Sequence, residues 1–296
     1  MSNEHTEQKE DMRPKKYPSF TGLLSDITYL DPDKIFAQIR GKVTVEKFKT
    51  PTADTPQPPN TLRLVCISDT HSTHGLIPEL PKGDVLVHAG DFTEVGMPAD
   101  IDAFCSWLGA LEGYKHKVVI AGNHDLSLEA SSYPSTFRRF GHRTMASTEE
   151  QIEKLKSVCT YLDHSAVDIE GVRFFGSPYQ PWFYDWAFNL DRGEPCRSKW
   201  ASMPTDVDVL ITHGPPLGHG DLCVPGNNRA GCADLLDWVE AHPPKVHIFG
   251  HIHEGYGVTT NNKTIFINAS TLDERYDKHH MNAPVVFDVP LPAKSS

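Results

Sequence analysis

Five short apolar runs that all end in the same way constrain the fold of this chain more than any other feature. They span residues 62–67, 84–88, 117–120, 207–211 and 246–249. Each run stops at Gly or another small residue that stands beside Asp, Asn or His. Strands that are apolar on both faces belong to buried sheets covered by helices, so the pattern predicts an α/β fold.

Helical patterns lie between these runs. Helices are expected over residues 98–111, 147–158 and 232–241. A capping box of Ser147 and Glu150 opens the second of them. A further helix is expected to begin at Asp31-Pro32, because proline suits the first helical position.

Other segments have the pattern of additional strands. They are residues 172–176, 264–268 and 285–289. Residues 42–48 alternate only weakly, as a strand at the edge of a sheet would.

The 296 residues suit one large α/β domain preceded by an extension. Residues 1–60 are polar and proline-rich, and segment 51–60 alone carries four prolines, which favours a linker or a strap across the surface. We expect the domain proper at 61–290 and a short tail at 291–296.

The charge balance bears on possible partners. Asp and Glu total 39 against 28 Lys and Arg, a formal net charge of −11. Long nucleic acid is not an expected partner, because it normally requires a basic face. No run approaches the ~18–20 apolar residues of a membrane span, so no membrane association is expected. Six scattered cysteines without a CxxC pair, and no apolar stretch at the start, predict a cytoplasmic protein with reduced thiols.

The ends of the five runs supply a set of polar side chains. They are Asp69, His71, Asp91, Asn123, His124, His213, His251 and His253. In open α/β sheets, ligands bind beyond the carboxyl ends of the strands. Oxygen and imidazole donors without a thiolate suit manganese, iron or zinc better than a cysteine-rich structural zinc site. The spacing of two within the Asp-x-His and His-x-His pairs predicts that both members of each pair point to one face.

The order of these groups resembles a known family. The motifs DTH, GD, GNHD, THG and GHIH, in that order, are typical of the calcineurin-like metallophosphoesterases. The longer strings CISDTHS, HAGDFTEVG, KVVIAGNHD, THGPPLG, FGHIHEGYG and FINAST resemble the MPPED group of that family. The resemblance implies an α/β/β/α sandwich, in which two central β-sheets are flanked by helices.

The resemblance also implies a site for two divalent metal ions, with manganese expected and iron or zinc as alternatives. One ion would be held by Asp69, His71, Asp91 and His253. The second would be held by Asp91, Asn123, His213 and His251, with Asp91 bridging. His124 would bind no metal and would face the phosphate and the leaving group as the catalytic residue. Some animal members carry Gly at the position of His251, whereas this chain has a complete set.

The implied function is a binuclear metal-dependent phosphohydrolase that cleaves phosphodiesters, with cyclic nucleotides as the expected substrates. The attacking group would be a hydroxide that bridges the metals. One alternative is a phosphomonoesterase or protein Ser/Thr phosphatase, although segment 90–94 departs from the GDxxDRG pattern of the latter. Another is a non-catalytic metal-binding scaffold. The oligomeric state stays open.

Several residues allow two interpretations. His88 is expected to be structural or to support the site. Asp125 either orients His124 or is a turn residue. The aromatic segment 178–186 is either a stacking wall for a nucleobase or a plug over a sheet. Arg138, Arg139 and Arg143 form either a solvated loop or a patch that attracts phosphate, and the glycines of 254–257 form a turn or let the backbone approach the metals.

Overall fold

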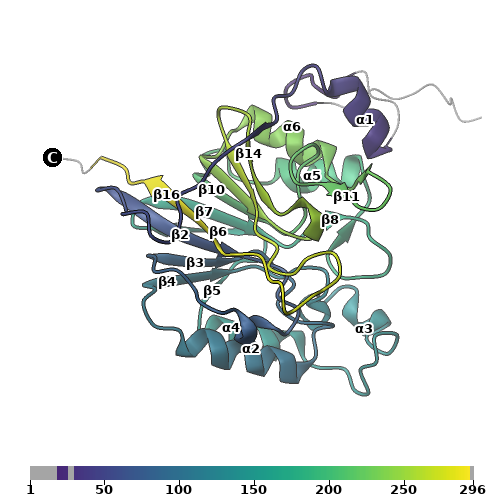
Figure 1. Cartoon of the computed structure of the whole chain (residues 1–296). Coiled ribbons are helices and arrows are strands. Elements are labelled where there is room, and N and C mark those ends of the chain that lie inside the picture. Colours follow the sequence, from purple (N-terminus) through teal and green to yellow (C-terminus); the bar gives the residue numbers. More distant parts are fainter. Residues whose placement is uncertain (1–18, 26–29, 294–296) are drawn as a thin grey trace, which may run out of the picture.

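The computed structural model describes residues 19–25 and 30–293. Two central β-sheets pack face to face, and helices cover the outer face of each sheet (Figure 1). The predicted α/β/β/α sandwich is therefore confirmed.

The first sheet has five strands. In spatial order they are β16 (Val285–Pro290), β2 (Thr61–Ile67), β3 (Val85–His88), β4 (His116–Val119) and β5 (Thr160–Tyr161). Strands β2 to β5 run parallel to one another, and β16 is antiparallel to β2.

The second sheet has seven strands. In spatial order they are β1 (Glu46–Lys47), β14 (Gly257–Thr260), β15 (Ile265–Asn268), β13 (Val246–Phe249), β10 (Val209–Thr212), β7 (Val172–Ser177) and β6 (Ser165–Ile169). Its four central strands are parallel. Two short pairs stand apart from both sheets, β8 (Gln180–Pro181) with β9 (Asn189–Leu190) and β11 (Leu222–Cys223) with β12 (Asn228–Arg229). The expected edge strand within 42–48 is confirmed as the two residues of β1.

Helices form the outer layers. They are α1 (Pro32–Ile39), α2 (Pro98–Ala110), α3 (Tyr133–Thr136), α4 (Thr148–Lys156), α5 (Glu194–Ala201) and α6 (Ala233–Ala241), with 3₁₀ turns η1 (His74–Leu76), η2 (Leu126–Leu128) and η3 (His253–Gly255). Helices α2 and α4 cover the five-stranded sheet, and α5 and α6 cover the other (Figure 1). As predicted, Ser147 caps α4, since its Oγ accepts the Glu150 N–H at 3.2 Å.

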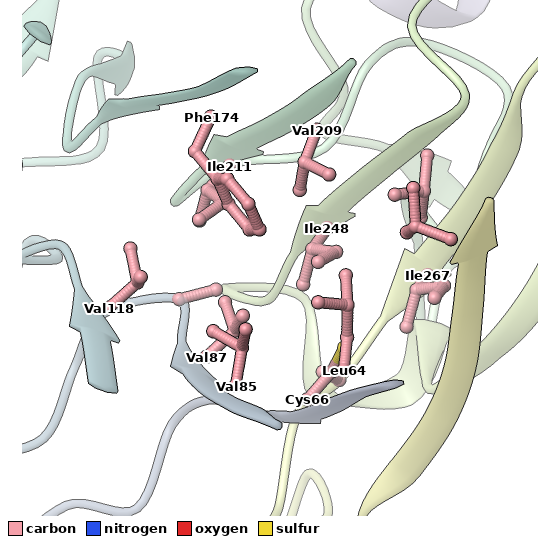
Figure 2. Close-up of a cluster of buried hydrophobic side chains, with 14 of the residues drawn as sticks. Leu64, Cys66, Val85, Val87, Val118, Phe174, Val209, Ile211, Ile248 and Ile267 are labelled. Atoms are coloured by element: carbon pink, nitrogen blue, oxygen red, sulfur yellow. The ribbon is translucent and has the colours of Figure 1, made fainter. Parts of the chain in front are cut away.

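The main core lies between the two sheets, and Figure 2 shows side chains of both sheets meeting there. Strand β2 explains the doubly apolar runs of the sequence. Its Leu64 and Cys66 point into the layer between the sheets, whereas Val65 and Ile67 belong to the cluster under α2 and α4. A strand covered on both faces has no solvated side, so its sequence does not alternate.

The parallel registers bring the strand ends together. Ile67 lies opposite His88 and His88 opposite Val119, so three chain segments leave the five-stranded sheet at one edge. A parallel bridge between Ser68 and Ser270 joins that edge to the other sheet. Within the described part of the chain, no helix is long and apolar enough to cross a bilayer. The cytoplasmic location stays a prediction.

Candidate metal centre

Eight polar side chains lie where the carboxyl ends of the two sheets meet. The five-stranded sheet supplies Asp69 and His71 after β2, Asp91 after β3, and Asn123 and His124 after β4; the seven-stranded sheet supplies His213 after β10, and His251 and His253 after β13. The structure thus brings together every residue that the sequence placed in the site.

Their donor atoms form two groups that suit metal ions. Oxygen and nitrogen atoms of Asp69, His71 and His253 all lie within 4.8 Å of one another. Atoms of Asp91, His213 and His251 do the same. Asn123 joins the second group, because its Oδ1 lies 2.9 Å from His213 Nε2. The two groups correspond to the two expected metal positions.

Asp91 stands between the groups. Its Oδ2 lies 3.3 Å from Nε2 of His213, which belongs to the second group, and 3.9 Å from Nε2 of His71, which belongs to the first. Its Oδ1 accepts the backbone N–H of His124 at 2.7 Å. A carboxylate in this position has oxygens within reach of both groups, as a bridging ligand requires.

Two of the imidazoles are oriented by backbone carbonyls. His213 Nδ1 donates to the Ala89 carbonyl and His253 Nδ1 donates to the Asp273 carbonyl, each at 2.9 Å. These bonds place one proton on Nδ1, so Nε2, which faces the site, is the nitrogen that would bind a metal ion. His253 Nε2 lies 3.5 Å from Asp69 Oδ1 and 3.3 Å from His71 Nε2. Three donor atoms that face one another in this way could bind one cation together.

The electrostatics of the centre fit a cation as well. Burial would lower the pKa of His213, but the charge of Asp91 overcomes this effect and raises that pKa to about 9. For His253, burial likewise lowers the pKa, but the hydrogen bond and charge of Asp69 outweigh this effect and raise the pKa to about 9. Burial lowers the pKa of His71 and of His251 to about 3, so both are neutral donors at pH 7. The two carboxylates thus attract positive charge into a site whose other donors are neutral. A metal ion can supply this positive charge in place of the protons.

Four of the expected ligand residues have strained backbone conformations. Asp69, His71, Asp91 and His251 have φ angles of +52°, +37°, +56° and +67°. Residues other than Gly rarely adopt this left-handed region, and such strain concentrates at functional sites. Asp69 and His71 do direct their donor atoms into one group, but the predicted reason, strand alternation, is wrong, because β2 ends at Ile67 and both residues have positive φ. Strand alternation likewise fails for His251 and His253, the latter being the first residue of η3.

Close backbone approach explains two glycines. A Cβ at Gly250 would lie 2.0 Å from Asp69 Oδ2, so any side chain there would displace this donor. A Cβ at Gly255 would lie 2.0 Å from the Gly220 carbonyl oxygen. Gly255 is therefore required by its packing against the neighbouring loop.

His124 differs from the other histidines of the site. Its Nδ1 donates to the Glu94 carbonyl at 2.6 Å, and its ring stacks on Trp186. The ring packs edge-on against His71, with 4.5 Å between the centroids. A ring nitrogen of His124 also lies within 4.8 Å of donor atoms of His71 and Asp91, so His124 borders the metal positions.

Asp125 does not orient His124. Its buried carboxylate accepts the backbone N–H groups of Asp91 (3.0 Å), Thr93 (3.0 Å) and Gly122 (2.8 Å). It therefore ties the loop after β3 to the loop after β4, which agrees with the turn-residue alternative.

Further buried residues support the expected ligands. His88 Nδ1 accepts the Gly90 N–H at 3.3 Å, so the proton of the neutral ring is on Nε2. Nε2 donates it to Thr70 Oγ1 at 2.9 Å, and Thr70 stands between Asp69 and His71 in the sequence. This agrees with the expected supporting role of His88. Ser270, in the FINAST string, donates its hydroxyl to Asp69 Oδ2 at 2.9 Å.

A cleft of about 260 Å³ opens over the centre. Besides the ligands, its lining includes Phe183, Cys223, Glu254, Glu274 and Tyr276. Tyr276, whose ring lies 4.9 Å from that of His71 and 4.8 Å from that of His253, was not found by sequence reasoning. It lies in a long loop without a recognisable pattern, so no signal pointed to it.

The aromatic segment 178–186 divides its side chains between two environments. Phe183 enters the cleft and contacts His251 edge-on at 5.4 Å, and Trp186 covers His124. Trp182 and Tyr184 are largely exposed. Arg139 forms an ion pair with Asp185 in this segment, so its charge is partly neutralised there.

Comparisons with known proteins agree with the site. Residues 62–255 match the model of the family described as calcineurin-like phosphoesterase. Metallophosphoesterase domain-containing protein 1 of Homo sapiens is 45% identical over 249 residues, which cover 82% of this chain and 75% of that protein. A UPF0046 protein of Caenorhabditis elegans is 40% identical over 274 residues, which cover 88% of this chain and 68% of that protein.

One solved structure supports the fold alone. The phosphopantetheinyl hydrolase PptH of Mycobacterium tuberculosis superposes with a TM-score of 0.51 at 13% identity, over 80% of this chain and 99% of that one. Together with the clustered Asp and His donors, the sequence matches identify the protein: it is a metal-dependent phosphoesterase that belongs to the MPPED group of the calcineurin-like phosphoesterase family.

Proposed function

We propose that this protein is a phosphodiesterase that uses two divalent metal ions, manganese first among them, and acts on small nucleotides such as cyclic nucleotides. The observation that carries the proposal is the position of Asp91 between two groups of donors. When bound, a pair of divalent cations supplies Lewis acidity toward phosphoryl oxygens and makes a water molecule acidic at neutral pH. Asp69, His71, Asp91 and His253 would hold one ion, and Asp91, Asn123, His213 and His251 the other.

The remaining groups of the site handle the leaving group. His124 keeps its proton on Nδ1 through the Glu94 carbonyl, and a second proton on Nε2 can pass to the leaving oxygen. Its main-chain N–H fixes Asp91 Oδ1, so the same residue orients the shared carboxylate. No side-chain nucleophile is needed in this scheme.

Two features of the cleft favour a diester of a nucleotide. Glu254 and Glu274 line it, and their charges repel a monoester dianion more than a diester monoanion. Phe183 and Tyr276, which are 40% and 46% exposed, offer ring faces on which a base could stack. The same acidic lining opposes a phosphoprotein or a long nucleic acid as substrate.

The test is a substrate panel with the purified full chain, loaded in turn with Mn²⁺, Zn²⁺ and Fe²⁺. The panel compares 2′,3′-cyclic and 3′,5′-cyclic nucleotides, bis(p-nitrophenyl) phosphate, and p-nitrophenyl phosphate as the monoester. We expect kcat/KM to be highest for a cyclic nucleotide. A preference for the monoester would support the phosphomonoesterase alternative, and no turnover of any substrate would support the scaffold alternative.

A further inference from the structure

Helix α1 belongs to the extension that precedes the family match, yet it is built onto the domain. Ile35 and Ile39 are buried in a cluster with Leu217 and Leu236. Upstream of the helix, the hydroxyl groups of Ser19 and Thr21 both donate to the carboxylate of Asp237 in α6. The helix therefore has a fixed place on the seven-stranded half of the molecule.

On another side of α1, Asp33 and Phe36 contact Arg229 of β12. Asp33 Oδ1 accepts the backbone N–H of Arg229 at 3.0 Å, and the Arg229 guanidinium lies 3.6 Å from the centre of the Phe36 ring. Asp221 Oδ1 completes the arrangement at 2.5 Å from Arg229 Nη1. Such a cation–π contact is worth more when the cation is partly buried, and the Arg229 side chain is only 19% exposed.

Arg229 lies in the β11–β12 hairpin, which borders the cleft through Cys223. It pairs with Leu222 across β11 and β12, and the next residue, Cys223, lines the cleft. The Val224 N–H donates to Glu254 Oε1 at 3.0 Å, directly after the ligand His253. Contacts therefore run without a break from α1, through the hairpin, to the cleft above the metal centre.

We propose that α1 positions the β11–β12 hairpin and thereby determines how well the cleft holds the nucleoside part of a large substrate. This inference rests on the proposed function for its substrate part. Loss of the contact with Phe36 would let the hairpin move away from η3. This movement would open the cleft on the side that Cys223 lines. The expected metal-binding side chains follow strands of the two sheets, and no hydrogen bond among the described residues joins them to the hairpin, so metal content and the turnover of small substrates would change little.

Cys223 provides a test that needs no activity. In the full, metal-loaded chain, the rate at which a maleimide modifies Cys223 reports how often the hairpin opens, with the modified residue located by mass spectrometry. For Phe36→Ala we expect a rate about fivefold higher, the factor that a lost cation–π contact would give in a local opening equilibrium. Phe36→Tyr keeps the ring and should restore the slow rate.

Matched variants complete this test. Asp33→Ala removes the hydrogen bond to Arg229 and also a charge that raises the pKa of the Cys223 thiol, so its rate is compared at equal thiolate fraction, taken from a pH profile of labelling. At equal thiolate fraction the rate should rise about two- to threefold, since one hydrogen bond is lost. Ala37→Ser, on the exposed side of the same helix, should leave the rate unchanged, and Cys223→Ser should abolish the signal. An unchanged rate in both Phe36→Ala and Asp33→Ala would overturn the proposed contact between helix and hairpin.

Kinetics test the substrate part. For Phe36→Ala, the KM for a cyclic nucleotide should rise about fivefold with kcat retained, while the KM for methyl p-nitrophenyl phosphate changes less than twofold. Equal changes for both substrates would overturn the role in holding the nucleoside part of the substrate. If the wild type hydrolyses nothing, the proposed function fails, and the maleimide rates still decide whether α1 holds the hairpin.

Discussion

The indole of Trp186 stacks on the imidazole of His124, with ring centroids 3.9 Å apart and an angle of 26° between the planes. The Glu94 carbonyl fixes the same imidazole through Nδ1. These two contacts hold the ring in one orientation and leave Nε2 available to a substrate. Trp186 comes from the aromatic segment, so this segment has a direct connection to the site that neither of its two predicted roles included.

Replacing Trp186 with Ala should therefore slow the reaction without removing metal. We expect kcat to fall about tenfold for diesters with poor leaving groups, because a freely rotating imidazole is less often in position to donate its proton. Trp186→Phe keeps a stacking ring and serves as the control. Steady-state kinetics together with metal analysis check this, and a loss of metal in Trp186→Ala would contradict it.

Replacing His124 with Ala removes the proton donor itself. The rate for alkyl leaving groups should fall about 100-fold, within the usual range for general acid catalysis. Nitrophenyl esters need little protonation and should lose less than about tenfold. The ratio of the two rates is the measurement, and equal losses would argue against the role as general acid.

Replacing His253 with Ala should lower metal content as well as rate. His253 is one of three donors in its group, so its loss should leave one of the two metal positions poorly occupied. Elemental analysis after dialysis gives the number of ions per chain. His280→Ala is the control, since that histidine is exposed and pairs with Asp277 on the surface. Full occupancy with normal turnover in His253→Ala would rule out its assignment as a ligand.

A buried carboxylate outside the candidate metal centre predicts a pH dependence of stability. Burial raises the pKa of Asp234 in α6 to about 6, whereas an unfolded Asp titrates near pH ~3.9. The folded chain thus binds the proton more tightly, so this contribution to stability is complete below about pH 4 and is lost as the pH rises through about 6.

Asp234→Asn has no carboxyl group to ionise. Its free energy of unfolding, relative to wild type, should rise by about 1–3 kcal/mol between pH 4 and pH 8. Urea denaturation at several pH values measures this difference. Asp206→Asn, at an exposed position, serves as the control for the loss of a carboxylate. A flat difference for Asp234→Asn would show that Asp234 titrates normally in the folded chain.

The sequence predicted the two-sheet core and the members of the site because both depend on strand ends. Runs such as 62–67 are apolar throughout, since Leu64 and Val65 face different buried layers. Because the parallel strands end at one edge of the sheets, polar residues directly after such runs come to lie together at that edge. The five apolar runs therefore led to all eight residues of the centre.

Other features left weaker patterns. Strand β6 buries only Ile169, and α5 buries only Cys196 and Trp200, so neither shows a clear periodicity. The role of Asp125 depends on backbone N–H groups of two loops, which no residue pattern specifies. Tyr276 reaches the cleft through the conformation of its loop, where its own φ is +56°.

The central claim is that donors from both sheets hold two metal ions on either side of Asp91. Anomalous diffraction from crystals of the Mn²⁺-loaded protein tests it most directly, because it counts the ions and locates them. We predict two peaks, one among Asp69, His71, Asp91 and His253, and the other among Asp91, Asn123, His213 and His251. A single peak, or peaks away from Asp91, would contradict the binuclear centre.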